Sequence, residues 1–340
     1  MKNNITLNES LSIPEIISKF LDDDQNRYSE IEKKIVENKI QYIVTIARGS
    51  SDCAATFGSY LFAKILGLPT YSLPPSIITL EKSEFNFSHA LVLVISQSGL
   101  SEDLLHCESR CRDMGALTVV LSNNKNSPMS NTANFFLYMG AGKEIGVAAT
   151  KTFILTLLNI VKLVANIAKR KELLKKINDL PKILHKEQTN TWDESLINKS
   201  IIRGFILSRG IGYALATEIS LKFKELCQEQ IESFSSAEVM HGPKSLIEER
   251  FKVFTLSMIG KSGLHIDQYL EFIKEKAKFI YSIGPSNNNK YTMNYESTSY
   301  IELDSIVVMS KIYPLIIKYS LMKGLDPDKP RYLSKLTKTY

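Results

Sequence analysis

The sequence has few cysteines and no long apolar run. Its four cysteines form no Cys-x-x-Cys pair, and no histidine or cysteine pair joins Cys107 and Cys111 to complete a zinc site. We interpret the cysteines as buried or unreactive thiols of a reducing cytoplasm. The best apolar stretch, residues 153–168, is interrupted by Asn159 and Lys162 and is too short to cross a bilayer. Neither a metal site nor a membrane span is therefore expected.

The sequence also lacks a signal-peptide core and a strong charge of one sign. The residues after Met1 are polar, which is not typical of a secretory leader. The net charge is +6, and the basic residues are scattered apart from a lysine-rich tail. Such a weak balance does not argue for nucleic acid, and it is compatible with an anionic small substrate. We expect a cytoplasmic protein with no nucleic-acid partner and no membrane partner.

One pattern of strands, loops and helices occurs twice in the chain. A length of 340 residues with 44% apolar residues favours two domains. Near-continuous apolar runs separated by helices predict parallel strands with right-handed crossovers. The paired runs are 42–47 with 204–208, 90–95 with 251–257, and 117–121 with 279–283. We therefore predict an α/β protein with two tandem units, each a doubly wound parallel sheet flanked by helices.

The repeat sets the predicted domain boundaries. A long helix over 147–170 and a charged stretch bridge the two units, and ligands are expected beyond the carboxyl ends of the strands. The predicted segments are a helical arm 1–40, a first unit 41–170, a helical linker 171–199, a second unit 200–325, and a tail 326–340.

A hydroxyl-rich loop follows the second apolar run of the first unit. Ser96, Gln97, Ser98 and Ser101 gather where a buried strand enters a helix. Free backbone amides and the helix dipole favour an anion there, so we predict a phosphate site. The alternative is N-capping by serine, which needs one hydroxyl rather than three. The second unit has no equal cluster, which indicates one phosphate site.

Two further clusters are ambiguous from the residues alone. Ser50 and Ser51 could add donors to the same anion, or they could belong to a tight turn and a capped helix. Glu218, Lys222 and Glu225 share one face of a predicted helix. Their spacing by itself favours a solvent-exposed stripe of salt bridges over a site.

A loop histidine and the tail complete the candidates. His241 precedes Gly242-Pro243, so it lies in a turn, where an imidazole can act as an acid or a base. A polar loop residue is the simpler interpretation. The tail 326–335 contains two prolines, and it could fold over a site or remain solvated.

These motifs together resemble a known family. From about residue 22 to residue 340, the chain is similar to the double sugar-isomerase (SIS) domain proteins. They include the isomerase half of glucosamine-6-phosphate synthase and the glutaminase-free glucosamine-6-phosphate deaminases. The motifs occur in the family's order, and they are Ser96-Gln-Ser-Gly99, Glu144-Ile-Gly-Val-Ala-Ala-Thr-Lys151, Lys222-Phe-Lys-Glu225, Glu238-Val-Met-His-Gly-Pro243, and Asp328-Lys-Pro330 with Lys335.

The resemblance implies a role for each candidate. Glu225 would carry the proton between C2 and C1, His241 of a neighbouring subunit would open the sugar ring, and Lys335 would meet the open chain. A homodimer is implied, with no cofactor and no metal. The remaining implied substrate-binding residues are Ser50, Ser51, Ser96, Gln97, Ser98, Ser101, Val147, Ala148, Glu218 and Lys222.

One departure from the synthases directs the expected activity. The synthases begin with a catalytic cysteine and a glutaminase domain, whereas residue 2 is lysine here and about forty residues precede the first strand. We therefore expect conversion of glucosamine 6-phosphate and water into fructose 6-phosphate and ammonia. The alternatives are an aldose–ketose isomerase, the aminotransferase half of a synthase-like enzyme, and a non-catalytic sugar-phosphate sensor.

Overall fold

The structure is a computed structural model that describes residues 4–24, 26–192, 203–286 and 291–335. The chain forms two compact units, and we describe each by itself. We call them the first-sheet unit and the second-sheet unit. The first-sheet unit comprises Glu15–Glu144, Lys151–Asp179 and Ser334–Tyr340. The second-sheet unit comprises Met1–Pro14, Ile145–Thr150 and Leu180–Leu333.

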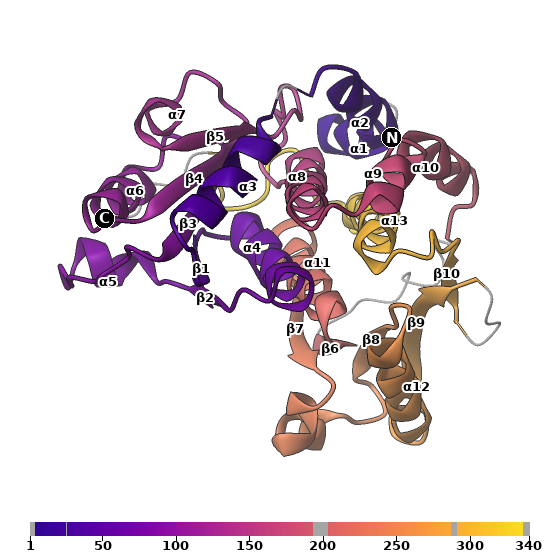
Figure 1. The fold of residues 1–340 in the computed structure, drawn as a ribbon. Coiled ribbons are helices and arrows are strands. Elements are labelled where there is room, and N and C mark those ends of the chain that lie inside the picture. Colours follow the sequence, from indigo (N-terminus) through magenta and orange to yellow (C-terminus); the bar gives the residue numbers. More distant parts are fainter. Residues whose placement is uncertain (1–3, 25, 193–202, 287–290, 336–340) are drawn as a thin grey trace. The chain divides into compact units, whose positions relative to one another are not determined.

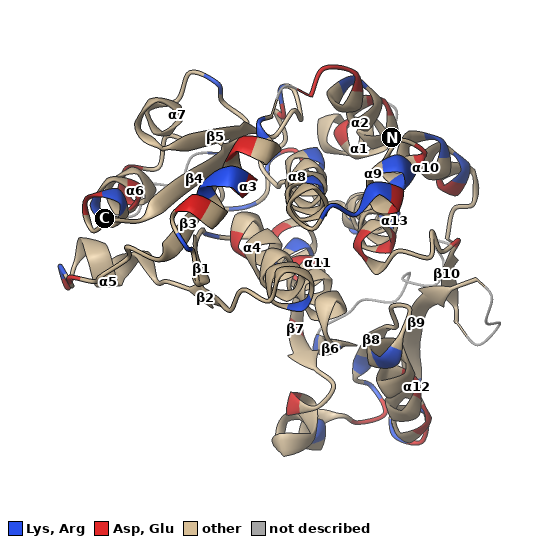
Figure 2. Cartoon of the chain, in the orientation of Figure 1, with Lys and Arg blue, Asp and Glu red and all other residues tan. Residues whose placement is uncertain are grey.

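The first-sheet unit is built on five parallel strands in the order β2-β1-β3-β4-β5. This is the order of the flavodoxin-like doubly wound sheet. The strands are β1 (Tyr42–Ile46), β2 (Thr70–Ser72), β3 (Ala90–Ser96), β4 (Leu117–Ser122) and β5 (Phe135–Tyr138). None of these described strands carries a charged residue, and they are tan in Figure 2. Every residue of β3 and β4 is buried, as expected when helices cover both faces.

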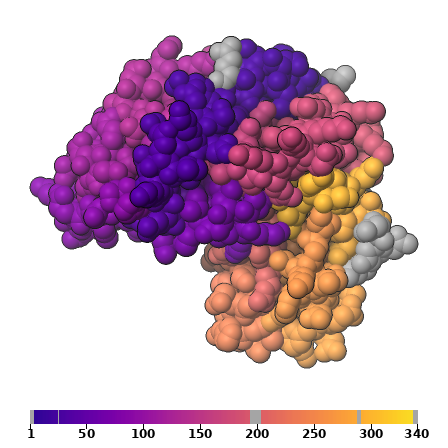
Figure 3. All heavy atoms as spheres, viewed as in Figure 1, coloured from indigo at the N-terminus to yellow at the C-terminus, as the bar shows by residue number. Residues whose placement is uncertain are grey.

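Helices surround this sheet (Figure 1). Buried Val44, Val92, Val94 and Val120 share one core cluster with Cys107 of α6. Helix α8 packs against α4 and α3, and α3 lies on the surface in the view of Figure 3. The helices are α2 (Ile13–Asp22), α3 (Tyr28–Glu37), α4 (Ser50–Leu61), η1 (Phe62–Leu66), α5 (Pro75–Thr79), α6 (Glu102–Asp113), α7 (Pro128–Thr132), α8 (Lys151–Ile167) and α9 (Lys171–Ile177).

The second-sheet unit repeats the same strand order. Its five parallel strands run β10-β9-β8-β6-β7, which is again 2-1-3-4-5 when they are numbered from β6. The strands are β6 (Arg203–Ser208), β7 (Gln230–Ser235), β8 (Lys252–Leu256), β9 (Phe279–Pro285) and β10 (Met293–Tyr295). Phe205, Leu207 and Val253 form its core with Phe251 and Ile273.

The helices of this unit centre on α13. By length and composition α13 could cross a membrane, but most of it is buried, and it packs on α11, α1 and α10 as a core helix does. It is a second apolar helix besides the stretch 153–168 noted in the sequence. The helices are α1 (Ile5–Leu11), α10 (Leu180–Thr189), α11 (Ile211–Cys227), η3 (Glu238–His241), η4 (Pro243–Leu246), α12 (Lys261–Lys274) and α13 (Ile301–Met322).

The structure departs from the predicted elements in two ways. Each sheet has five strands rather than the three predicted. The additional strands are short, as β2, β5 and β10 are, or partly polar, as β7 is, and were therefore missed. The helix predicted over 147–170 was placed too early. It begins at Lys151, where the buried Glu144 carboxylate accepts a hydrogen bond from the Thr152 amide at 3.2 Å.

The compact units also cut across the predicted segments. The arm 1–40 is divided at Pro14, so that α1 belongs to the second-sheet unit and α3 to the first. The linker 171–199 is divided in the same way between α9 and α10, and its residues 193–199 lie outside the described part. The tail is divided between Leu333 and Ser334, with residues 336–340 outside the described part.

Candidate active site

The loop that joins β3 to α6 is held in a tight left-handed conformation. Gly99 has a φ of +63°, and a Cβ atom there would lie 2.4 Å from Ser127 Oγ. The Gly99 amide donates to Ser96 Oγ at 3.2 Å. A side chain at residue 99 would therefore strain the backbone and clash, which explains the glycine in the Ser-Gln-Ser-Gly motif.

The hydroxyls of this loop are not accounted for by helix capping. Ser101 is the N-cap residue of α6, yet its side chain makes no capping hydrogen bond. Ser98 Oγ accepts from the nearby Leu100 amide at 3.2 Å. The simple capping interpretation of Ser101 is therefore wrong, and its hydroxyl sits at a helix start, where an anion is favoured.

A cavity of about 330 Å³ opens at this loop within the first-sheet unit. It brings together the predicted residues Ser51, Ser96, Gln97, Ser98 and Ser101 with Lys335 of the tail. Ser50 starts α4 beside Ser51 but is not among the lining residues. The full lining is Arg48, Gly49, Ser51, Ile95, Ser96, Gln97, Ser98, Ser101, Asp103, Leu104 and Lys335.

The tail lysine is held by a buried carboxylate. Lys335 Nζ lies 3.2 Å from Glu144 Oε2, and the Glu144 side chain is fully buried. The same carboxylate accepts from the Thr152 amide and from Thr152 Oγ1, at 3.2 and 2.6 Å. Glu144 thus links the start of α8 to the lysine in the cavity. The sequence contained both members of this pair but could not connect them.

Residues that the sequence reasoning did not select also shape the cavity. Arg48 donates through Nε to Asp103 Oδ2 at 2.7 Å, so an ion pair lines the wall. Asn124 Nδ2 donates to the Ser98 carbonyl at 3.1 Å, and the Asn123 amide donates to the Gln97 carbonyl at 3.1 Å. Both asparagines directly follow β4. The carboxyl ends of neighbouring parallel strands share one sheet edge, so the position of Asn123 and Asn124 directly after a predicted strand could have identified them as neighbours of the loop after β3.

Helix α11 of the second-sheet unit carries a buried charge cluster. Lys222 Nζ contacts Glu225 Oε2 and lies 3.5 Å from Glu218 Oε1, and Lys222 and Glu218 are fully buried. Tyr313 of α13 donates its hydroxyl to Glu218 Oε1 at 2.9 Å. The solvent-exposed stripe favoured from spacing is therefore wrong, because α13 covers this face of α11.

Glu225 differs from the other members of this cluster in its exposure. Its side chain is 21% exposed, whereas Lys222 is completely covered. The Glu225 carboxylate contacts the buried ammonium group of Lys222. The arrangement fixes a carboxylate that solvent or a ligand can reach, which is what a general base requires.

The other predicted residues of the second-sheet unit lie apart from this cluster along the chain. His241 ends η3 and is exposed. Ala148 is buried and Val147 is half-buried. Both lie in Ile145–Thr150, which belongs to the second-sheet unit, whereas the next element, α8, belongs to the first-sheet unit. The roles of His241, Val147 and Ala148 rest on the resemblance.

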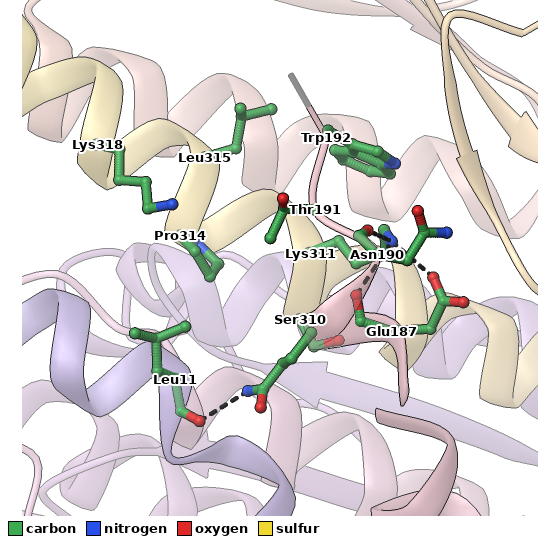
Figure 4. Close-up of a pocket in the computed structure, with 11 residues that line it drawn as sticks. Leu11, Glu187, Asn190, Thr191, Trp192, Ser310, Lys311, Pro314, Leu315 and Lys318 are labelled. Atoms are coloured by element: carbon green, nitrogen blue, oxygen red, sulfur yellow. Dashed lines mark hydrogen bonds and ion pairs between the residues drawn. The ribbon is translucent and has the colours of Figure 1, made fainter. Parts of the chain in front are cut away.

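Figure 4 shows a second cavity, which lies between α10 and α13 of the second-sheet unit. Lys311 lines this cavity and donates to Glu187 Oε2 at 2.7 Å and to the Asn190 carbonyl at 2.5 Å. The ammonium also faces the Trp192 ring, at 5.3 Å from its centroid. Because Lys311 already has these partners, we interpret its ion pair with Glu187 as a structural contact that joins α10 to α13.

Metal-ligating side chains do not gather in the described part of the chain. Among residues 4–24, 26–192, 203–286 and 291–335, no group of three or more His, Cys, Asp or Glu residues could hold a metal ion.

Comparison with known proteins gives related results for sequence and structure. The model of the SIS domain family matches residues 38–165. The chain is 32% identical over 334 residues to a glutamine–fructose-6-phosphate aminotransferase (isomerizing) from Sulfurisphaera tokodaii. This match covers 95% of the chain and 54% of that protein, so the chain spans about half the length of the relative.

Two solved structures have the same fold along nearly the whole chain. A proposed phosphosugar isomerase from Silicibacter pomeroyi has a TM-score of 0.87 and 29% identity, with 96% of this chain and all of that chain covered. A glucosamine-6-phosphate deaminase from Thermotoga maritima has a TM-score of 0.79 and 18% identity, with 98% and 99% covered. The second likeness is one of fold alone.

Proposed function

Because residues 38–165 are a SIS domain, as the motifs predicted, we propose that this chain is an enzyme acting on amino-sugar 6-phosphates. We propose that the second sheet is a second unit of the same kind, supported by its identical strand order. The proposed reaction converts glucosamine 6-phosphate and water into fructose 6-phosphate and ammonia. A cytoplasmic location is part of this proposal.

The hydroxyl-lined cavity of the first-sheet unit is the observation that carries the substrate class. It combines Ser96, Ser98 and Ser101 with the start of α6 and with the ammonium group of Lys335. Hydroxyls, helix-terminal amides and a cation together suit a phosphate group. Ser51 and Gln97 line the same wall, and we assign them to phosphate binding as well.

We assign the proton transfer to Glu225. In the proposed sequence His241 opens the pyranose ring, and Glu225 removes the proton from C2 to form an enolamine. Glu225 then returns the proton to C1, which leaves a ketimine at C2. Water adds to this ketimine, and its hydrolysis releases ammonia and fructose 6-phosphate. Lys335 would meet the open-chain sugar, and the remaining implied lining residues are Val147, Ala148, Glu218 and Lys222.

A second candidate is the isomerase half of an aminotransferase that takes ammonia from a partner. The 32% identity to a glutamine–fructose-6-phosphate aminotransferase favours it. The residues assigned to phosphate binding and proton transfer would be the same. The difference lies in the direction of the reaction and in the source of nitrogen.

The decisive experiment measures ammonium and ketose 6-phosphate released from a panel of amino-sugar 6-phosphates. We expect equal amounts of both products from glucosamine 6-phosphate. Interconversion of aldose and ketose phosphates without ammonium would indicate an isomerase. Glucosamine 6-phosphate made from fructose 6-phosphate only with an added glutaminase would indicate the aminotransferase half. Binding without turnover would indicate a sensor and contradict the proposal.

We further propose a homodimer in which His241 serves the neighbouring subunit. Its exposed position at the end of η3 is compatible with that role. Mixing His241→Ala with Glu225→Gln protein under subunit exchange should restore part of the activity. Heterodimers demonstrated by mass spectrometry but without activity would place both residues in the site of one subunit.

A further inference from the structure

Helix α1 of the second-sheet unit buries three polar side chains although it is short, and one of them, Ser10, bonds within the helix to the Leu7 carbonyl. Thr6 is completely buried and Glu9 is 8% exposed. Buried polar groups are nearly always hydrogen-bonded, so their partners show what the helix holds. Thr6 and Glu9 find partners in segments that lie far from α1 in the sequence.

Thr6 holds the tail. Its amide and its hydroxyl both donate to Asp328 Oδ1, each at 2.7 Å, and the Ile5 amide donates to Asp328 Oδ2 at 2.9 Å. Asp328 therefore satisfies amides of the first turn of α1 that have no partner within the helix. Burial alone would raise the pKa of Asp328, but hydrogen bonds from Thr6 and Ile5 hold it below its ordinary value.

Glu9 holds the segment 145–150. The Ile145 amide donates to Glu9 Oε1 at 2.7 Å, and the Gly146 amide donates to Glu9 Oε2 at 3.0 Å. The approach is close, because a Cβ atom on Gly146 would lie 2.8 Å from Thr6 Oγ1 and 3.1 Å from Glu9 Oε2. The glycine of the Glu-Ile-Gly motif thus lets the backbone rest directly on α1.

We propose that α1 is a positioning brace for the active site, with Thr6 and Glu9 holding two segments that carry site residues. The inference rests on the proposed function, which assigns Val147 and Ala148 to the substrate and Lys335 to the open-chain sugar. Val147 and Ala148 directly follow the amides held by Glu9. Asp328, held by Thr6, precedes Lys335 in the same tail. Neither Thr6 nor Glu9 touches the substrate in this proposal.

The test uses single variants that remove the ties and leave α1 intact. Thr6→Val removes the hydroxyl at almost unchanged shape, and Glu9→Gln removes the charge and one acceptor. Thr6→Ser keeps the hydroxyl and serves as the rescue variant. Asn8→Ala is the matched control, since Asn8 is exposed on the same helix.

We expect Thr6→Val and Glu9→Gln to lower the kcat of ammonium release by about 10- to 100-fold, the usual effect of a small misplacement of catalytic groups. The Kd for inorganic phosphate should stay within about twofold in Glu9→Gln, because residues 145–150 do not line the phosphate cavity. Backbone amides of 145–150 should exchange hydrogen faster in Glu9→Gln, and those of 328–333 faster in Thr6→Val. Thr6→Ser and Asn8→Ala should behave as the wild type.

Hydrogen exchange separates failure of the brace from failure of the proposed function. If the wild type releases no ammonium, the proposed function is wrong. The brace is rejected separately, if hydrogen exchange of residues 145–150 and 328–333 is unchanged in Glu9→Gln and Thr6→Val. Reduced kcat with unchanged local exchange would overturn the proposal. Faster exchange throughout β6, β8 and β9 would also overturn it, because α1 would then support the whole fold.

Discussion

The two sheets have the same strand order, but the segments at their carboxyl ends carry different chemistry. In the first sheet, the last residue of β3 and the loop after it present three serines, a glutamine and the start of α6. In the second sheet, the equivalent loop after β8 is Ser257-Met-Ile-Gly260, and one further serine, Ser262, lies in the first turn of α12. Conversely, α11 buries a lysine between two glutamates, whereas α4, which follows the first strand of the other sheet, contains neither lysine nor glutamate.

This difference shows that the strand order and the functional side chains depend on different parts of the sequence. The strand order decides which loops meet at one sheet edge, and it is identical in both units. The side chains on those loops and on the first helix decide what each edge can do. The first-sheet unit is suited to hold an anion, and the second-sheet unit holds a carboxylate beside a buried cation.

The largest effect should come from Glu225, because it tests whether the second-sheet unit supplies the base. Glu225→Gln keeps the shape of the side chain and removes the base, so we expect kcat to fall by about 10²- to 10⁴-fold. Steady-state ammonium release measures this. The matched control is Glu271→Gln, which changes an exposed acid on α12. Wild-type turnover in Glu225→Gln would remove Glu225 from the mechanism.

The second prediction concerns Lys222 and the stability of the second-sheet unit rather than the reaction rate. Lys222→Met leaves two carboxylates without the buried ammonium group, so the free energy of unfolding should fall by about 3–5 kcal/mol. Urea denaturation monitored by circular dichroism measures it. Lys224→Met on the same helix changes an exposed lysine and should stay within about 0.5 kcal/mol of the wild type. Equal losses in both variants would contradict a special role for the buried cluster.

The serines compare the two loops directly. Ser98→Ala should raise KM far more than it lowers kcat, since one hydrogen bond to a charged group contributes about 1.5–3 kcal/mol. Ser262→Ala makes the same change in the first turn of α12, at the corresponding edge of the second sheet, and should leave KM unchanged. Isothermal titration with inorganic phosphate provides an independent Kd. Equal effects in both loops would mean that the sheets do not differ in anion binding.

Arg48 and Asp103 test how the first-sheet cavity balances its charge. Arg48→Ala leaves the Asp103 carboxylate uncompensated in a cavity lining that we assign to phosphate, so Kd for phosphate should rise by about three- to tenfold. The double variant Arg48→Ala with Asp103→Asn should recover most of the affinity. A double variant as weak as the single one would show that Arg48 binds the anion directly.

The smallest effect concerns only the reactivity of thiols, and it compares a cysteine on α4 with a cysteine on α11. Cys53 on α4 is half-buried, whereas Cys227 on α11 is buried, and burial raises the pKa of its thiol. Because thiolates are the reactive form, a disulfide reagent at pH 8 should label Cys53 and leave Cys227 unmodified until urea is added. Cys107 should also resist, since burial raises the pKa of its thiol to about 12. Mass spectrometry of peptides identifies the labelled residue.

Much of the fold could be predicted because its signals are local. Apolar runs such as 90–95 and 117–121 correspond to β3 and β4, and the repeated spacing predicted two parallel sheets. The short or partly polar strands β2, β5, β7 and β10 were not predicted, because pairing with a neighbour rather than their own composition defines them. The start of α8 was missed for a related reason, since a side chain outside the helix sets it.

The sequence by itself determined the hydroxyl cluster after a buried strand and the common helical face of Glu218, Lys222 and Glu225. Only the tertiary structure decided that this face is covered by α13, that Lys335 reaches the cavity beside Glu144, and that α1 holds the tail through Asp328. The physical reason is that periodicity reports which residues share a face. Burial, and with it the strength of every charge on that face, depends on segments far away along the chain, since Tyr313 lies 95 residues from Glu218.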